Sequence, residues 1–321
     1  MNNPPRLIEA AGITVELRRD GSGPPLLVIH GELGVPGWLE SFAHLAERYD
    51  VIVPSLPGYG RSTRPDWVMG VHDLAAWVTW FARDLDLRTP VNVIGCSLGG
   101  WAAAEIATVA PSFFNKMVLV GAMGIKPEQG EIFDYFLESG LTGLRRAFHQ
   151  PEQSSEFVRH WGNEWTSEEA DLVEQHREMT CRIAWKPYMH SLTLRHLLPG
   201  IRTPTLLVWG REDAITPIDS GEIYQRAIPR SQLVVIENCG HMPEMEGTGG
   251  VREAGRGFPG RLSKSRAANA RGGSPVRLPC RCPRLVVRCP PLTKSAVCRS
   301  AATGGDRWRR GSSINAPNRR P

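Results

Sequence analysis

The sequence lacks any uninterrupted apolar stretch close to the roughly 20 residues that a transmembrane helix needs. Its first residues also lack the basic and then apolar pattern of a secretory signal peptide. The seven cysteines are an odd number, which argues against a disulfide framework in a chain without that signal. These absences predict a cytoplasmic protein with no membrane partner.

The cysteines near the end of the chain do not form a metal-binding pattern. Cys280 and Cys282 are separated by one residue, whereas zinc sites typically separate such a pair by about two to four residues. No histidine accompanies this pair, or Cys289 and Cys298 after it. We therefore expect no metal and no cofactor.

Charge is divided unevenly along the chain. Residues 248–321 hold 17 of the 38 basic residues and two of the 33 acidic ones, so the part before them is acidic. This tail is rich in Arg, Gly, Pro and Ser without periodicity, which predicts disorder. Its basic charge could hold nucleic acid non-specifically, but no specific nucleic-acid partner is expected. These residues could be a disordered extension of the protein. The abrupt change in composition at Gly247 instead favours the interpretation that residues 248–321 result from a reading-frame change in an arginine-rich coding region.

Before the tail, short apolar runs alternate with segments of helical spacing. The strands of this pattern are predicted at residues 14–18, 26–30, 51–53, 91–96, 117–120, 205–209 and 233–236. Such alternation is typical of a doubly wound, mostly parallel α/β sheet. Residues 125–201 interrupt it with helical patterns and many aromatic residues. We expect a core at 1–124 and 202–247, and a helical cap at 125–201 inserted after the sixth strand.

One glycine-lined turn carries the clearest chemical signal. The sequence GCSLGG at residues 95–100 follows an apolar strand and precedes an alanine-rich helix. Gly95 and Gly99 remove the Cβ atoms that would collide where a strand turns abruptly into a helix. Such a turn exposes the Ser97 hydroxyl at the edge of the sheet, beside the positive N-terminus of the helix. Ser97 is the candidate nucleophile.

Two later residues complete a candidate catalytic triad. A serine hydroxyl is a poor nucleophile and needs an adjacent base, which His241 would supply. Asp213 would orient His241 and stabilise its imidazolium form. Glu212 and Asp219 are rivals for that acidic role. The chain order Ser, Asp, His is that of the nucleophile-elbow hydrolases.

Over roughly residues 8–247 the chain resembles the α/β-hydrolase family, specifically its capped esterase-like group. The motifs that carry the resemblance are HG at 30–31, PGYGRS at 57–62, the turn at 95–100, WGRED at 209–213 and GHMP at 240–243. The resemblance implies the α/β-hydrolase fold and favours Asp213, which matches the family's Gly-x-x-Asp turn. Family members continue into a helix that packs on the sheet. Here the C-terminal closing helix is missing from the pattern, because the basic tail replaces it.

The resemblance also implies where the oxyanion hole lies. One backbone N–H would come from Leu98, the residue after the nucleophile, and the other from Glu32. Leu33 is the alternative to Glu32, and His30 is expected to hold this loop rather than to act in catalysis. In the cap, Trp185 and Tyr188 are the expected substrate-binding residues.

These residues predict a serine hydrolase that forms an acyl-enzyme and acts on an ester, or related acyl, bond of a small and largely apolar molecule. Three alternatives stay open. The first is hydrolysis of a carbon–carbon bond, as in meta-cleavage product hydrolases, and the second is a cofactor-free haloperoxidase. The third is a weakly active or inactive binding scaffold. The oligomeric state stays open as well.

Overall fold

The strands form one eight-stranded sheet in the computed structural model, which describes residues 4–246. The order in the sheet is β1-β2-β4-β3-β5-β6-β7-β8. The strands are β1 (Arg6–Ala10), β2 (Ile13–Asp20), β3 (Pro25–Ile29), β4 (Asp50–Pro54), β5 (Val91–Cys96), β6 (Phe114–Val120), β7 (Thr205–Gly210) and β8 (Ser231–Ile236). The pairs β1–β2 and β2–β4 are antiparallel, and every other neighbouring pair is parallel. The predicted mostly parallel sheet is confirmed.

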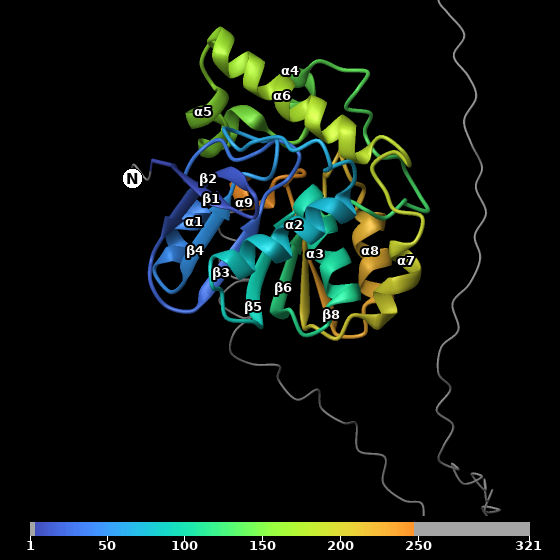
Figure 1. Ribbon diagram of the computed structural model, residues 1–321. Helices are drawn as coiled ribbons and strands as arrows, with labels where there is room; N and C mark the ends of the chain where they lie inside the picture. The colour runs from blue at the N-terminus through green and yellow to red at the C-terminus, as the bar shows by residue number, and fades with distance from the viewer. Residues whose placement is uncertain (1–3, 247–321) are drawn as a thin grey trace, which may run out of the picture. The chain divides into compact units, whose positions relative to one another are not determined.

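Helices cover the sheet. Those of the core are α1 (Glu40–Ala46), α2 (Val71–Asp84), α3 (Leu98–Val109), α8 (Ile218–Ala227) and α9 (Pro243–Glu246). Figure 1 shows α2 and α3 side by side in front of the sheet, where they contact each other, while α1 contacts β4 and α9. Apolar side chains of α2 such as Leu74, Trp77 and Phe81 are fully buried. This burial explains the helical spacing that the sequence shows.

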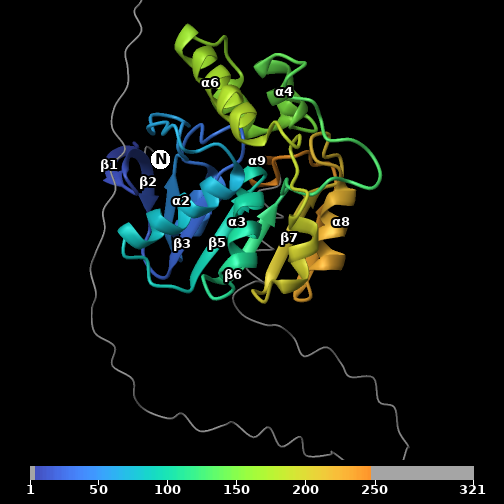
Figure 2. The same cartoon turned by 45° about the vertical axis from the view of Figure 1, so that its right-hand side comes forward.

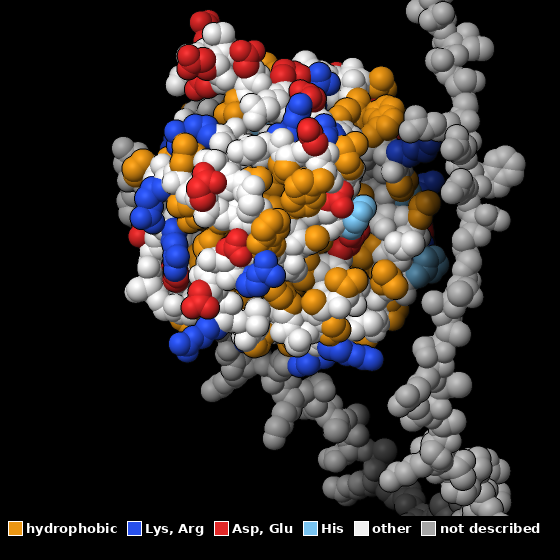
Figure 3. All heavy atoms as spheres, viewed as in Figure 1, with side chains coloured by type: hydrophobic (Ala, Val, Ile, Leu, Met, Phe, Trp, Pro, Cys, Tyr) orange, Lys and Arg blue, Asp and Glu red, His pale blue; other side chains and the backbone are white. Residues whose placement is uncertain are grey.

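A helical cap follows the sixth strand, as expected. Between β6 and β7 lie α4 (Gly140–Arg146), η1 (Pro151–Gln153), α5 (Ser155–Trp161), α6 (Ser167–Ala184), α7 (Leu194–Leu197) and η2 (Leu198–Gly200). Figures 1 and 2 both show α4 and α6 beyond the end of the sheet. In Figure 3 acidic side chains gather over the far end of α6, whose first turn contains Glu168 and Glu169. In contrast to α4 and α6, the short segments α7 and η2 pack against the core, where both contact α3 and η2 also contacts α8.

The sequence pattern did not indicate strand β1. Ala11 and Gly12, both with positive φ, turn the chain back so that Arg6–Ala10 pairs with β2. Most of the β1 side chains are exposed, so the segment shows no apolar period. The expected tail at 248–321 and the missing closing helix both lie outside the described residues. No helix within residues 4–246 is long and apolar enough to cross a membrane.

Candidate active site

The turn between β5 and α3 holds Ser97 in a strained backbone conformation. Its φ of 48° and ψ of −113° are unusual for a residue with a side chain. A Cβ atom on Gly99 would lie 2.2 Å from the Ile29 carbonyl oxygen, and one on Gly95 would lie 2.7 Å from the Gly99 carbonyl oxygen. The amide of Ser97 donates to the Val120 oxygen at 2.8 Å, which fixes the turn to β6. The predicted glycine requirement therefore has a direct steric cause.

A continuous chain of hydrogen bonds joins Ser97, His241 and Asp213. The Ser97 Oγ lies 2.7 Å from His241 Nε2, and His241 Nδ1 lies 2.8 Å from Asp213 Oδ2. All three residues are buried. The other oxygen of Asp213 accepts from the amides of Ile215 and Thr216, at 2.9 and 2.8 Å. Both carboxylate oxygens are thus held in place.

The two rival acids lie elsewhere. Asp219 accepts hydrogen bonds from the amides of Glu128 and Gln129. Glu212 accepts from the amide of Cys239 at 2.9 Å. Neither carboxylate contacts the His241 ring, and Asp213 does.

Three carboxyl groups surround the His241 ring. Asp213 follows β7, Glu32 follows β3 with its Oε1 3.7 Å from His241 Nε2, and Glu244 lies on α9. Burial alone would lower the pKa of His241, but the charge and hydrogen bond of Asp213, with Glu32 and Glu244, raise it to about 9. Burial raises the pKa of Glu244 itself to about 7. An imidazolium at position 241 is therefore strongly stabilised.

The loop that carries His241 is tied to both the cap and α9. The amide of His241 donates to the Ala147 oxygen at 2.7 Å, just after α4. Glu246 accepts from the amides of Gly240 and His149, each at 2.8 Å. One carboxylate at the end of α9 thus bridges the histidine loop and the cap.

The loop after β3 approaches Ser97 closely. A Cβ on Gly31 would lie 2.9 Å from the Cβ of Ser97. Within residues 4–246 the amides of Glu32 and Leu98 donate no hydrogen bond, so both are available to an oxyanion. The amide of Leu33, the alternative to Glu32, has no acceptor within these residues either.

His30 holds this loop, as expected. Its Nε2 accepts from the Leu56 amide at 2.8 Å, and its Nδ1 donates to the Gly31 oxygen at 2.7 Å. Burial lowers the pKa of His30 to about 3, so the ring stays neutral and keeps the acceptor that the Leu56 amide needs. Neither of these two hydrogen bonds involves Ser97.

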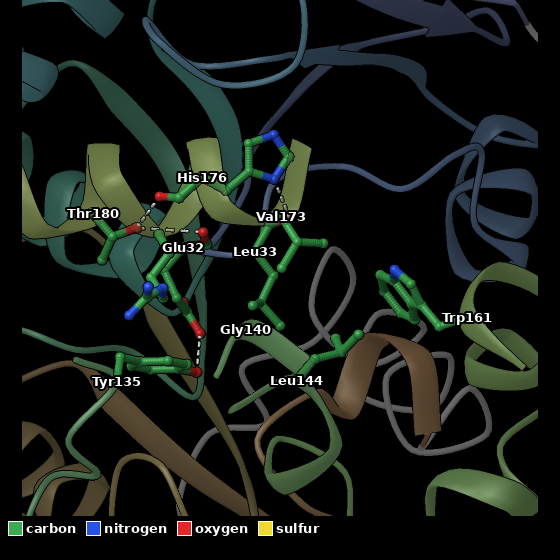
Figure 4. Close-up of a pocket in the computed structure, with 10 residues that line it drawn as sticks. Glu32, Leu33, Tyr135, Gly140, Leu144, Trp161, Val173, His176 and Thr180 are labelled. Atoms are coloured by element: carbon green, nitrogen blue, oxygen red, sulfur yellow. Dashed lines mark hydrogen bonds between the residues drawn. The ribbon is translucent and has the colours of Figure 1, made fainter. Parts of the chain in front are cut away.

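A pocket next to the triad lies between the loop after β3 and the cap. Its lining, shown in Figure 4, consists of Glu32, Leu33, Tyr135, Gly140, Leu144, Trp161, Val173, His176, Arg177 and Thr180. The side chain of Glu32 points to the Tyr135 hydroxyl, which donates to its Oε1 at 2.6 Å. The sequence pointed only to the backbone amide of Glu32, whereas the structure also places its buried carboxyl group at the pocket.

The two aromatic residues expected to bind substrate lie outside this lining. Trp185 is 58% exposed and packs against the Phe136 and Tyr188 rings. The Tyr188 hydroxyl donates to the Phe133 oxygen and accepts from the amide of Tyr135 at 2.9 Å. Tyr188 thus supports the segment that carries Tyr135. In this conformation neither Trp185 nor Tyr188 lines the pocket.

The geometry agrees with a comparison of the whole chain with known families. A model of the alpha/beta hydrolase fold family matches residues 24–248. The chain belongs to this family. The resemblance that the motifs indicated is therefore confirmed, and so is the fold that it implied.

Relatives in this family have different activities. A 2-hydroxy-6-oxo-2,4-heptadienoate hydrolase of Pseudomonas putida is 25% identical over 279 residues, which cover 75% of this chain and 91% of the relative. A pimeloyl-[acyl-carrier protein] methyl ester esterase of Nitrosomonas europaea is 27% identical, covering 72% and 93%. A solved 2-hydroxy-6-oxo-6-phenylhexa-2,4-dienoate hydrolase of a Rhodococcus species has a TM-score of 0.59 at 20% identity, covering 79% and 96%. The last likeness concerns the fold alone.

Within the described residues, no group of three or more His, Cys, Asp or Glu side chains could hold a metal ion. Cys96, Cys181 and Cys239 are free thiols.

Proposed function

We propose that this family member is a serine hydrolase that cleaves an ester bond of a small, largely apolar molecule. The observation that carries the proposal is the unbroken hydrogen-bond chain from Ser97 through His241 to Asp213, at a strained turn beside two free backbone amides. Leu33, Leu144, Trp161 and Val173 give the adjacent pocket an apolar wall, which suits an acyl or alkyl group once the cavity, about 30 Å³ in this structure, widens.

The proposed reaction has two halves. His241 takes the proton of the Ser97 hydroxyl as the oxygen attacks the ester carbonyl, and the amides of Glu32 and Leu98 donate to the resulting oxyanion. The tetrahedral intermediate collapses, His241 returns the proton to the leaving alcohol, and an acyl-enzyme remains. Water, activated in turn by His241, then releases the acid and restores Ser97. Asp213 stays ionised throughout and keeps the His241 ring in one orientation.

Hydrolysis of a carbon–carbon bond is the second candidate, because one relative with 91% of its length covered is a dienoate hydrolase. The same residues would serve it, with a ketone carbonyl in place of the ester. The two candidates differ in the leaving group and in the carboxylate that a dienoate carries.

Labelling with a fluorophosphonate probe tests the nucleophile. The wild-type protein should be labelled at Ser97, and Ser97→Ala should not be labelled. Ser112→Ala, which alters an exposed serine, is the matched control and should be labelled normally. A protein whose Ser97 resists the probe would support the binding scaffold instead.

Substrate profiling separates the two hydrolase candidates. We expect turnover of p-nitrophenyl esters of graded chain length, and little turnover of a meta-cleavage dienoate measured beside them. If the dienoate is hydrolysed with a higher kcat/KM than every ester, the ester assignment is wrong and carbon–carbon bond hydrolysis takes its place.

A further inference from the structure

Glu32 carries a buried carboxyl group whose hydrogen bonds are only half complete. The residue is 3% exposed, and its Oε1 accepts from the Tyr135 hydroxyl. Its Oε2 is buried and has no hydrogen-bond partner within residues 4–246. A buried polar atom without a partner costs free energy, and a charged one costs more. This oxygen is therefore an acceptor that a bound molecule can satisfy.

The carboxyl group stands where the pocket meets the triad. Glu32 lines the pocket, whereas Ser97 and His241 do not. The same side chain brings its Oε1 to 3.7 Å from His241 Nε2. Figure 4 shows it extending from the loop after β3 towards Tyr135, across the pocket from Trp161. A molecule that reaches from the pocket to the Ser97 hydroxyl passes the Glu32 carboxylate.

Few positive charges offset this carboxylate. Within the described part of the chain its only ion-pair partner is the His241 ring. Arg177 also lines the pocket, but its guanidinium is bound to Glu174 at 2.6 Å. Burial lowers the pKa of His176, another lining residue, to about 4, so that ring is neutral. In a buried site of low dielectric, a second carboxylate brought next to Glu32 would be repelled, and a cation attracted.

We propose that Glu32 selects the charge of the substrate: the site takes esters that carry an ammonium group near the scissile carbonyl and rejects those with a carboxylate there. The ammonium group donates to the unpartnered Oε2 and balances the charge that Glu32 brings into the pocket. This inference rests on the proposed ester hydrolysis and names its substrate class.

A matched series of esters tests the preference in the wild-type protein. The p-nitrophenyl esters of 3-aminopropanoate, butanoate and 3-carboxypropanoate differ mainly in the charge at one end of the acyl chain. After subtraction of the uncatalysed rates, kcat/KM should be about 10- to 100-fold higher for the ammonium ester than for the carboxylate ester, because hydrogen bonds to charged groups are worth that much. A wild-type protein that prefers the carboxylate ester overturns the proposal.

Two variants separate charge from packing. Glu32→Gln keeps the shape but removes the charge, and should reduce the ammonium-to-carboxylate ratio by about 10- to 100-fold. It should also move the acid limb of the pH profile of kcat/KM to lower pH, because Glu32 contributes to the raised pKa of His241. Tyr135→Phe removes one hydrogen bond to Glu32 but keeps the carboxylate, so it should change both the ratio and the limb much less than Glu32→Gln does. Equal losses of the ratio in both variants would show a structural role and overturn the proposal.

Binding without turnover distinguishes this inference from the proposed function. At equal concentration and ionic strength, hexylammonium should raise the melting temperature of the wild-type protein more than hexanoate does. If hexylammonium binds but no ester is hydrolysed, the hydrolase assignment fails while the charge selection stands. If esters are hydrolysed without regard to charge, the hydrolase assignment stands and the charge selection fails. Both wild-type measurements remain decisive if Glu32→Gln does not fold.

Discussion

The triad and the pocket beside it are built in different ways. Ser97 directly follows β5 and Asp213 lies in the turn after β7, and the Ser97 amide is bonded to the neighbouring strand β6. Most of the pocket wall instead comes from cap segments that reach the core through side chains, such as Tyr135 to Glu32 and His176 to the Leu33 oxygen. Backbone pairing fixes the positions of the reacting groups, whereas the shape of the pocket depends on individual side chains. Substitutions should therefore act on rate in the first part and on substrate choice in the second.

The largest effect is expected at the nucleophile. Ser97→Ala should lower kcat for p-nitrophenyl esters by about 10⁴-fold or more, since only binding and the oxyanion hole remain. The melting temperature should change little, because the turn keeps its glycines and its backbone hydrogen bonds. More than a tenth of the wild-type kcat in a clean sample would remove Ser97 from the mechanism.

The acid partner should be nearly as sensitive. Asp213→Asn should lower kcat by about 10³- to 10⁴-fold, because the amide favours the wrong tautomer of His241. Asp219→Asn is the matched control and should keep most of the activity, since Asp219 only accepts from two amides of a loop. A large loss in the control, with none at position 213, would reverse the assignment.

pH should act on rate and stability in opposite directions. The neutral ring of His241 is the base, and its pKa is raised from 6.5 to about 9, so kcat/KM should increase by about tenfold per unit on the acid side of that value. The same shift stabilises the fold fully below pH 6.5, and this contribution is lost as pH rises through about 9. Rate profiles and melting curves over the same range measure both. A rate that is flat from pH 6 to 9 would contradict the raised pKa.

The smallest effects are expected in the cap, on selectivity alone. Leu144→Ala should change the ratio of kcat/KM for hexanoate and acetate esters by about tenfold, because a methylene group in an apolar pocket is worth at least that. Trp185→Ala should change the same ratio less, since Trp185 is exposed and outside the pocket lining. Hydrolysis of the acetate ester should stay close to wild type in both. If Trp185→Ala changed this ratio more than Leu144→Ala does, Trp185 would be a substrate-binding residue after all.

The same contrast explains what the sequence predicted. The turn at 95–100 was recognisable because the glycines, the serine and the flanking strand and helix are adjacent in the chain. Asp213 and His241 were found because each follows an apolar strand, and carboxyl ends of parallel strands meet at one edge of the sheet. Local patterns of this kind were enough to predict the mostly parallel sheet and the point in the chain where the cap is inserted.

The pocket was beyond such reasoning. Tyr135, Leu144, Trp161 and His176 come from four separate stretches of the cap, and no fixed spacing relates them. The role of the Glu32 side chain was hidden as well, because a glutamate in a loop usually faces solvent. One signal in the sequence could have indicated this role. Glu32 was expected to donate its backbone amide to the oxyanion, and an amide in that place brings its own side chain close to Ser97. Strand β1 was missed for a simpler reason, because its exposed side chains show no period.

The hydrogen bond from the His241 amide to the Ala147 oxygen provides a way to measure movement of the cap. Ser97 is 2% exposed, so the segments that cover it have to move before a substrate can reach it, and the cap is the candidate for this movement. Movement of the segment after α4 would break this bond and leave the His241 amide free to exchange its hydrogen with solvent. The deuterium uptake of that single amide would therefore count the openings of the cap, and comparison of its rate with kcat would tell whether entry or chemistry limits turnover.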